Sequence, residues 1–146
     1  MSSESPQANA LAYAGTLPFV ICAMLPWVGV PVLPVVGGCA DVAASYGVVI
    51  VSFMAGVHWG TYLYQSARTP LNLFVTSNAV AVSVWLAWLV MPVAITLAVL
   101  IGAFLILLSI DTRLAQLRLL SDRYMQMRRN VTAIVVLMLV VTFAGV

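Results

Sequence analysis

The stretch "NLFVTSNAVAVSVWLAWLVMPVAITLAVLIGAFLILLSID", residues 72–111, decides the fold class of this chain. Residues 72–110 contain no charged side chain, so the stretch holds two segments of about 20 apolar residues, each long enough to cross a bilayer as a helix. The break between them is only "VMPV", residues 90–93, which leaves one long kinked segment or a re-entrant pair as alternatives there. Across the whole chain 64% of residues are hydrophobic and 7% are charged, against about 25% charged in a soluble domain. The chain is therefore predicted to be an integral membrane protein.

The other apolar stretches predict three further crossings of the membrane. Prolines and glycines after residue 25 end the first of these stretches, and Arg68 with Pro70 ends the second, because such residues interrupt helices. The start, "MSSESPQANALAYAG", lacks the basic segment that opens a secretory signal peptide, so we expect the first helix to be retained. We therefore expect one all-α domain, residues 1–146, that forms an integral membrane bundle of five transmembrane helices. The expected spans are 9–29, 43–65, 72–90, 92–111 and 129–146.

The arginines indicate how this bundle is oriented. All six basic residues are arginines, and five of them lie between residues 113 and 129. Five crossings place the N-terminus, Arg68 and this arginine-rich segment on the same side, which the positive-inside rule makes the cytoplasm, with the C-terminus outside. We expect the arginines to contact lipid headgroups or a partner protein, and not nucleic acid, because they alternate with apolar residues at the bilayer edge. These headgroup or partner contacts are Arg113, Arg118, Arg123, Arg128 and Arg129.

His58 is the only histidine, and it lies in an apolar span. It precedes Gln65 by seven residues and so lies about 10 Å from the end of its helix. Asn78 follows Asn72 by six residues on the next helix and lies about 9 Å deep. A short connection makes these helices antiparallel neighbours. We therefore expect His58 to be neutral, buried, and hydrogen-bonded to Asn78 or to a polar group of the first helix near Thr16.

This pairing would form part of a larger buried polar cluster. Tyr62 and Gln65 follow His58 at helical spacing and continue its face, so the expected cluster is His58, Asn78, Thr16, Tyr62 and Gln65. Three roles stay open for His58: a structural side chain, a proton- or substrate-linked site, or a ligand of haem or quinone. A bis-histidine haem needs a second histidine, and a metal needs nearby Cys, Asp or Glu ligands. No catalytic residue, metal site or cofactor is predicted.

The same predicted helix carries small residues at a four-residue spacing. Ser52, Gly56 and Gly60 repeat the pattern twice, and small residues at this spacing permit close approach of helix backbones in membranes. Gly56 and His58 point in nearly opposite directions, so we expect helix packing and polar chemistry to use different faces.

The remaining reactive side chains do not form a catalytic set. Cys22 and Cys39 are both expected toward the outer side, where they form either a disulfide or two buried free thiols. The four acidic residues are scattered at the ends of segments: Glu4, Asp41, Asp111 and Asp122.

Three stretches together resemble a known group of sequences. They are "AYAGTLPF" at 12–19, "YGVVIVSFMAGVHWG" at 46–60 and "RYMQMRRNVTAIVVL" at 123–137. In order and spacing the chain resembles an uncharacterised family of small bacterial inner-membrane proteins, with relatives among mitochondrial multi-spanning proteins. Ala55 departs from the family pattern, in which we expect glycine. The resemblance implies an inner-membrane location and no established activity.

These observations favour a non-enzymatic accessory or assembly protein of a bacterial inner-membrane complex. Its expected partners are the lipid bilayer and other membrane-protein subunits or further copies of itself. The alternative is a small oligomeric transporter or proton-linked permeation protein that uses the polar track of His58 and Asn78. A haem- or quinone-binding subunit is the third possibility.

Overall fold

The structure, a computed structural model, describes residues 6–65, 69 and 72–146. Its elements are α1 (Pro6–Ala14), α2 (Leu17–Met24), the short 3₁₀ helix η1 (Leu25–Val28), β1 (Val32–Leu33), β2 (Gly37–Gly38), α3 (Cys39–Gln65), α4 (Leu73–Val90), α5 (Val93–Gln116) and α6 (Asp122–Ala144). Five stretches are long and apolar enough to cross a membrane: Asn9–Val28, Cys39–Gln65, Leu73–Val90, Val93–Gln116 and Asp122–Ala144. The prediction of an all-α bundle with five membrane-spanning segments is confirmed.

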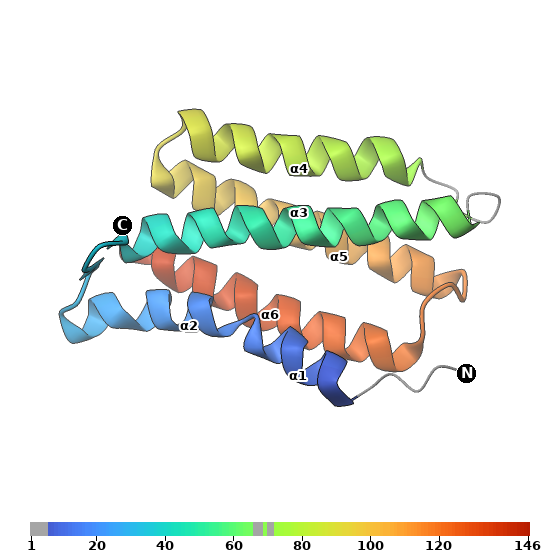
Figure 1. Cartoon of the computed structure of the whole chain (residues 1–146), viewed down its shortest axis with the longest axis horizontal. Helices are drawn as coiled ribbons and strands as arrows, with labels where there is room; N and C mark the ends of the chain where they lie inside the picture. The colour runs from blue at the N-terminus through green and yellow to red at the C-terminus, as the bar shows by residue number, and fades with distance from the viewer. Residues whose placement is uncertain (1–5, 66–68, 70–71) are drawn as a thin grey trace.

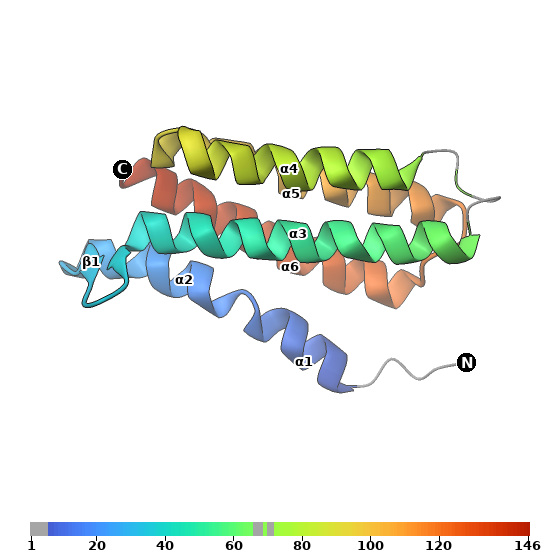
Figure 2. The same cartoon turned by 45° about the horizontal axis from the view of Figure 1, so that its top comes forward.

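The first crossing is interrupted between α1 and α2. Pro18 lies in the first turn of α2, where its missing N–H is tolerated. The Thr16 hydroxyl donates to the carbonyl of Tyr13 at 2.7 Å, and the Tyr46 hydroxyl of α3 donates to the carbonyl of Gly15 at 3.1 Å. These bonds hold the break, and Figure 2 shows α1 leaning away from the rest of the bundle beyond it.

The uncertain boundary after residue 90 is a turn between two antiparallel helices. Met91 and Pro92 separate α4 from α5, and the two helices run side by side in both views (Figures 1 and 2). The buried hydroxyl of Thr96 donates to the carbonyl of Ala87 across this turn at 3.0 Å. A single kinked segment is therefore not present at residues 90–93, and each of the two helices is long and apolar enough to cross a membrane by itself.

The last two helices extend beyond their expected membrane spans. The α5 helix continues five residues past the expected end at 111, and α6 begins seven residues before the expected start at 129. Leu114 is buried, so the additional turn of α5 is held by packing within the bundle. As a result, Asp111 and Arg128 both lie inside helices rather than at their ends.

The apolar core lies between α2, α3, α5 and α6. Phe19 and Phe104 meet edge to face with ring centroids 6.1 Å apart, and the side chains of Leu100 and Leu139 are fully buried beside them. Gly47 lets α3 approach α5 closely, because a Cβ at this position would lie 2.7 Å from a methyl carbon of Leu100. The α4 helix packs on α3 and α5 at the periphery.

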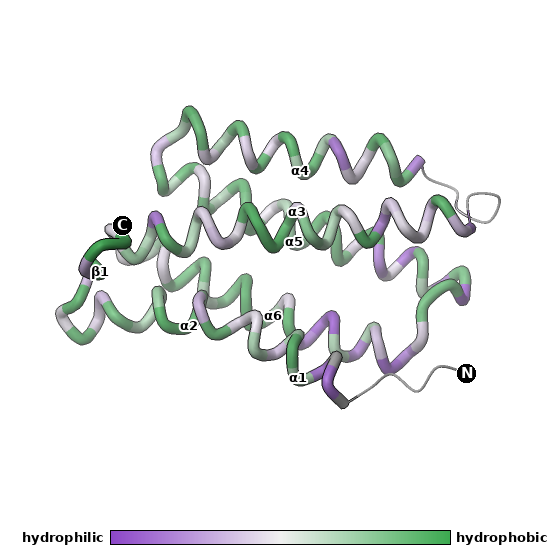
Figure 3. Tube along the Cα trace, in the orientation of Figure 1, coloured by the Kyte–Doolittle hydropathy of each residue, from purple (hydrophilic) through white to green (hydrophobic). Residues whose placement is uncertain are grey.

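The two ends of the bundle differ in polarity. The start of α1, the end of α3, the start of α4 and the α5–α6 connection lie at one end, and the C-terminus and the α4–α5 turn lie at the other (Figure 1). Figure 3 shows hydrophilic residues gathered toward the first of these ends. The arginine-rich segment is thus at the end where α1 begins, as predicted. Arg68 lies outside the described residues.

The two cysteines lie together near the opposite end. Cys22 and Cys39 are both free and buried, and they pack in one small cluster with Ala43. The Cys39 thiol donates to the carbonyl of Val30 at 3.5 Å. The alternative of two buried free thiols is the one that the structure contains.

Candidate functional site

Three membrane helices bring ionisable side chains together inside the bundle. His58 of α3, Asp111 of α5 and Arg128 of α6 form a buried cluster, hereafter the charged cluster. Nε2 of His58 lies 2.8 Å from Oδ1 of Asp111, and Nε of Arg128 donates to Oδ2 of the same carboxylate at 2.8 Å. Nη1 of Arg128 also donates to the hydroxyl of Thr132, one turn further along α6, at 3.0 Å. One carboxylate thus joins three helices.

The cluster forms because its members lie at the same depth. His58 precedes the end of α3 by seven residues, Asp111 precedes the end of α5 by five, and Arg128 follows the start of α6 by six. At a rise of 1.5 Å per residue, each lies about 8–11 Å from the same end of the bundle. These depths coincide because α3 and α5 run parallel and both end at this end of the bundle, whereas α6 runs antiparallel to them and begins there.

Charge balance explains how such groups are tolerated inside the bundle. His58 is 2% exposed, Asp111 3% and Arg128 4%, and an unpaired charge at such burial is strongly unfavourable. The negative charge of the Asp111 carboxylate compensates the positive charge of the Arg128 guanidinium. The carboxylate accepts hydrogen bonds from both Arg128 and His58, so Nε2 of His58 carries a proton. Nδ1 of His58 has no partner, and the neutral imidazole leaves only a lone pair there. The imidazolium would instead bury a second N–H without an acceptor.

The predicted partner of His58 is wrong, although its predicted burial is correct. Asn78 is exposed, and its amide donates to the carbonyl of Phe74 at 2.8 Å. Ser77, one residue earlier, is the buried side chain, because the packing of α4 on α3 and α5 turns that position inward. Thr16 is buried but bonds to Tyr13 on its own segment.

The predicted continuation of the polar track is not formed either. Tyr62 stacks edge to face on Phe74 with ring centroids 4.6 Å apart. The side-chain carbonyl of Gln65 is buried without a partner. Within the part of the chain that the structure describes, no hydrogen bond joins either side chain to His58.

Sequence reasoning missed Asp111 and assigned Arg128 to the wrong environment. Asp111 was expected at the end of a segment, although Leu107 and Leu114 flank it at helical spacing and are buried with it. That spacing is the signal that identifies Asp111 as an inward-facing residue. Arg128 is buried within the bundle, whereas the other four arginines of the segment are exposed: Arg113, Arg118, Arg123 and Arg129.

The predicted packing residues do not pack within this chain. Ser52 and Gly56 are exposed and Gly60 is half-buried, and a Cβ added at either glycine would meet nothing within 4 Å. They lie along the outer face of α3. Next to α4 this face forms a shallow groove of about 240 Å³, lined by Ser52, Ala55, Gly56, Trp59, Ser77, Asn78 and Ala81. We call it the small-residue groove.

The charged cluster supplies hydrogen bonds and compensated charge. Among the described residues, no group of three or more His, Cys, Asp or Glu side chains could hold a metal ion. Asp111 already accepts from both His58 and Arg128. The arrangement therefore fixes three helices in register, and it presents the second terminal nitrogen of Arg128, Nη2, without a partner.

The comparison with known proteins yields one match. Residues 5–144, nearly the whole chain, match a protein family described as "Protein of unknown function (DUF3429)". No curated protein and no solved structure matches the chain.

Proposed function

We propose that this chain, which belongs to the DUF3429 family of proteins of unknown function, is a non-enzymatic accessory or assembly protein of a membrane complex. We place it in the bacterial inner membrane, with its N-terminus in the cytoplasm. The observation that carries the proposal is the small-residue groove between α3 and α4, together with the exposed amide of Asn78 beside it.

Asn78 gives this groove a preference for another protein over lipid. It lies five residues inside α4, about 8 Å from the helix end. Its Nδ2 bonds to its own helix, and the described residues give its side-chain oxygen no partner. An amide oxygen without a donor is unfavourable in hydrocarbon, so the groove fits a helix that brings a hydrogen-bond donor to this depth. Gly56 and Gly60 leave room for that backbone to approach closely.

The charged cluster supports this role from inside the bundle. Asp111 binds side chains of both α3 and α6, and α3 carries the small residues of the groove. Buried hydrogen bonds between helices restrict how these helices can rotate or slide. The outer face of α3 is therefore presented to a partner in one fixed geometry.

Site-specific cross-linking tests the proposal. A photo-reactive amino acid at Ser52 should cross-link a transmembrane helix of another subunit, whereas the same amino acid at Val140, exposed on α6, should not. Gly56→Leu should abolish the cross-link from Ser52. Gly102→Leu is the matched control, because a Cβ at this α5 glycine also meets nothing within 4 Å.

Two outcomes would overturn the accessory role. The first is a chain that purifies from mild detergent only as a free monomer and gives no cross-link from Ser52. The second is equal loss of the cross-link in Gly56→Leu and Gly102→Leu, which would show that the groove does not select the partner.

The charged cluster favours a second candidate, a small proton-linked permeation protein. Ionisable residues inside membranes commonly mark ion or proton pathways, and His58 with Asp111 is such a pair. Vesicles that contain the reconstituted protein should then show a proton flux that His58→Ala abolishes and that Arg129→Ala, at an exposed position, leaves unchanged. Absence of flux in the wild type would favour the accessory role.

A further inference from the structure

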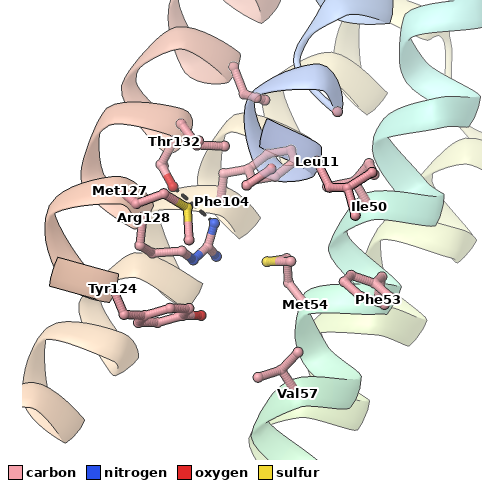
Figure 4. Close-up of a pocket in the computed structure, with 14 residues that line it drawn as sticks. Leu11, Ile50, Phe53, Met54, Val57, Phe104, Tyr124, Met127, Arg128 and Thr132 are labelled. Atoms are coloured by element: carbon pink, nitrogen blue, oxygen red, sulfur yellow. Dashed lines mark hydrogen bonds between the residues drawn. The ribbon is translucent and has the colours of Figure 1, made fainter. Parts of the chain in front are cut away.

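A second hollow, on the opposite side of α3 from the small-residue groove, lies between α1, α3 and α6. Its volume is about 380 Å³, and Figure 4 shows its side chains converging from these helices. Apart from Arg128, Thr132 and Tyr124 the lining is apolar, including Leu11, Ile50, Phe53, Met54, Phe104 and Val135. We call it the α1–α6 pocket.

The break in the first crossing creates this pocket. Gly15 lines it at the point where α1 stops, and α1 leans outward from there (Figure 2). Leu11 and Phe53 at its rim are 73% and 65% exposed, so the mouth faces the side of the bundle, where membrane lipid lies. A molecule dissolved in the bilayer can therefore enter sideways without passing through water.

Arg128 supplies a buried hydrogen-bond donor that has no partner among the described residues. Its Nε and Nη1 are bonded to Asp111 and Thr132, whereas Nη2 is buried without a partner. Figure 4 shows the guanidinium directed from α6 into the pocket, with the sulfur of Met54 facing it. Buried donors are normally satisfied. Methionine is unbranched and flexible, so rotation of Met54 opens Nη2 to an acceptor.

The charge of the cluster selects the kind of acceptor. Asp111 already neutralises Arg128, so a carboxylate in the pocket would bring an uncompensated negative charge into an apolar site. An uncharged carbonyl oxygen accepts from Nη2 without that penalty. We propose that the α1–α6 pocket binds a membrane-soluble molecule whose uncharged carbonyl oxygen accepts a hydrogen bond from Nη2 of Arg128 and whose apolar body contacts the pocket wall.

Two constituents of membranes carry this chemistry. One is a quinone with an apolar tail, and the other is an acyl lipid with ester carbonyls. Both present a carbonyl joined to a long apolar chain, and both reach the mouth of the pocket from the bilayer. The site does not depend on the proposed accessory role, because it uses other residues of α3.

The experiment uses the full chain in nanodiscs of ether-linked phosphatidylcholine, which contains no ester carbonyl. Decylubiquinone, a diacyl phosphatidylglycerol and decanoate are added separately, and the thermal unfolding midpoint is followed by circular dichroism. Ala12→Phe fills the pocket, because Ala12 lines it and is half-buried. Ala14→Phe is the control, since Ala14 is exposed on the same helix and is not among the lining residues.

The wild type and Ala14→Phe should be stabilised by the quinone, by the diacyl lipid, or by both, and the active compound identifies the source of the carbonyl. Ala12→Phe should weaken that binding about tenfold, the loss expected when about two fewer methylene groups are buried. In protein labelled with ¹⁵N-arginine, the same compound should shift the resonances of Arg128, which an Arg128→Lys sample identifies.

Three results would overturn the proposal. They are stabilisation by neither carbonyl compound, an equal response of Ala12→Phe and Ala14→Phe, and a stronger response to decanoate than to both uncharged compounds. The Ser52 cross-link of the accessory proposal is measured on the other face of α3, so failure of one proposal is distinguishable from failure of the other.

Discussion

Removal of Asp111 tests whether the charged cluster holds the bundle together. Asp111→Leu leaves the guanidinium of Arg128 buried without a counter-charge and removes the hydrogen-bond acceptor of His58. At the observed separation of 2.8 Å, the gross Coulomb attraction between two unit charges is about 6 kcal/mol for an effective dielectric constant of 20. Desolvation of both charges offsets much of this attraction. Stranding one partner of a buried pair nevertheless costs about 3–5 kcal/mol, and this is the loss in unfolding free energy that we expect.

A double variant separates the stranded charge from the loss of packing. Asp111→Leu with Arg128→Met removes both charges and keeps apolar volume at both positions. Because no charge is then left unpaired, we expect it to be more stable than Asp111→Leu alone by about 2 kcal/mol. His58 still lacks its acceptor, so a residual loss of about 1–3 kcal/mol remains.

Equilibrium unfolding in mixed micelles, titrated with dodecyl sulfate and followed by near-ultraviolet circular dichroism, measures these differences. Arg129→Met is the control at the next, exposed position of α6, and it should change the unfolding free energy by no more than about 0.5 kcal/mol. A double variant as unstable as Asp111→Leu, or a loss in Arg129→Met equal to that in Asp111→Leu, would refute the reasoning.

Two further outcomes follow from the packing and from the charge distribution. Gly47→Val should destabilise the bundle by about 1–3 kcal/mol through overpacking, because an added Cβ lies 2.7 Å from Leu100. The control in the same unfolding assay is Gly102→Val, which should be nearly neutral because a Cβ at that position meets nothing within 4 Å. Equal losses of unfolding free energy in the two variants would contradict this. Reporter fusions should place Arg118 in the cytoplasm and Val146 outside, and a periplasmic signal at Arg118 would reverse the proposed orientation.

The candidate site could be predicted only in part. The isolation of His58 in an apolar span correctly indicates burial, because an imidazole in such a span avoids lipid by facing the bundle. The choice of Asn78 as its partner used depth alone, and depth does not determine which way a helix is rotated about its axis. Successive residues of a helix point about 100° apart, so the inward position of Ser77 turns Asn78 outward.

Asp111 and Arg128 show a second limit of the sequence. Both were placed at the membrane edge because hydropathy assigns charged residues to the ends of apolar spans. The opposite charges of Asp111 and Arg128 compensate each other, which removes the preference for the membrane edge. This pairing becomes visible only when α5 and α6 are placed side by side. The turn of α5 that follows Asp111 is held by buried Leu114, and it keeps Asp111 within a helix that packs against α6.

The sequence by itself determined the membrane class and the five crossings. It also determined that the arginine-rich segment lies at the same end of the bundle as the start of α1. These properties depend on the lengths of apolar runs and on where charges interrupt them, and a backbone in hydrocarbon has to satisfy its hydrogen bonds within each helix. Only the tertiary structure decided the partner of His58, the burial of Arg128 and the pocket beside it. Those features depend on how each helix is rotated about its axis, which side-chain packing between helices sets, and no single segment carries that information.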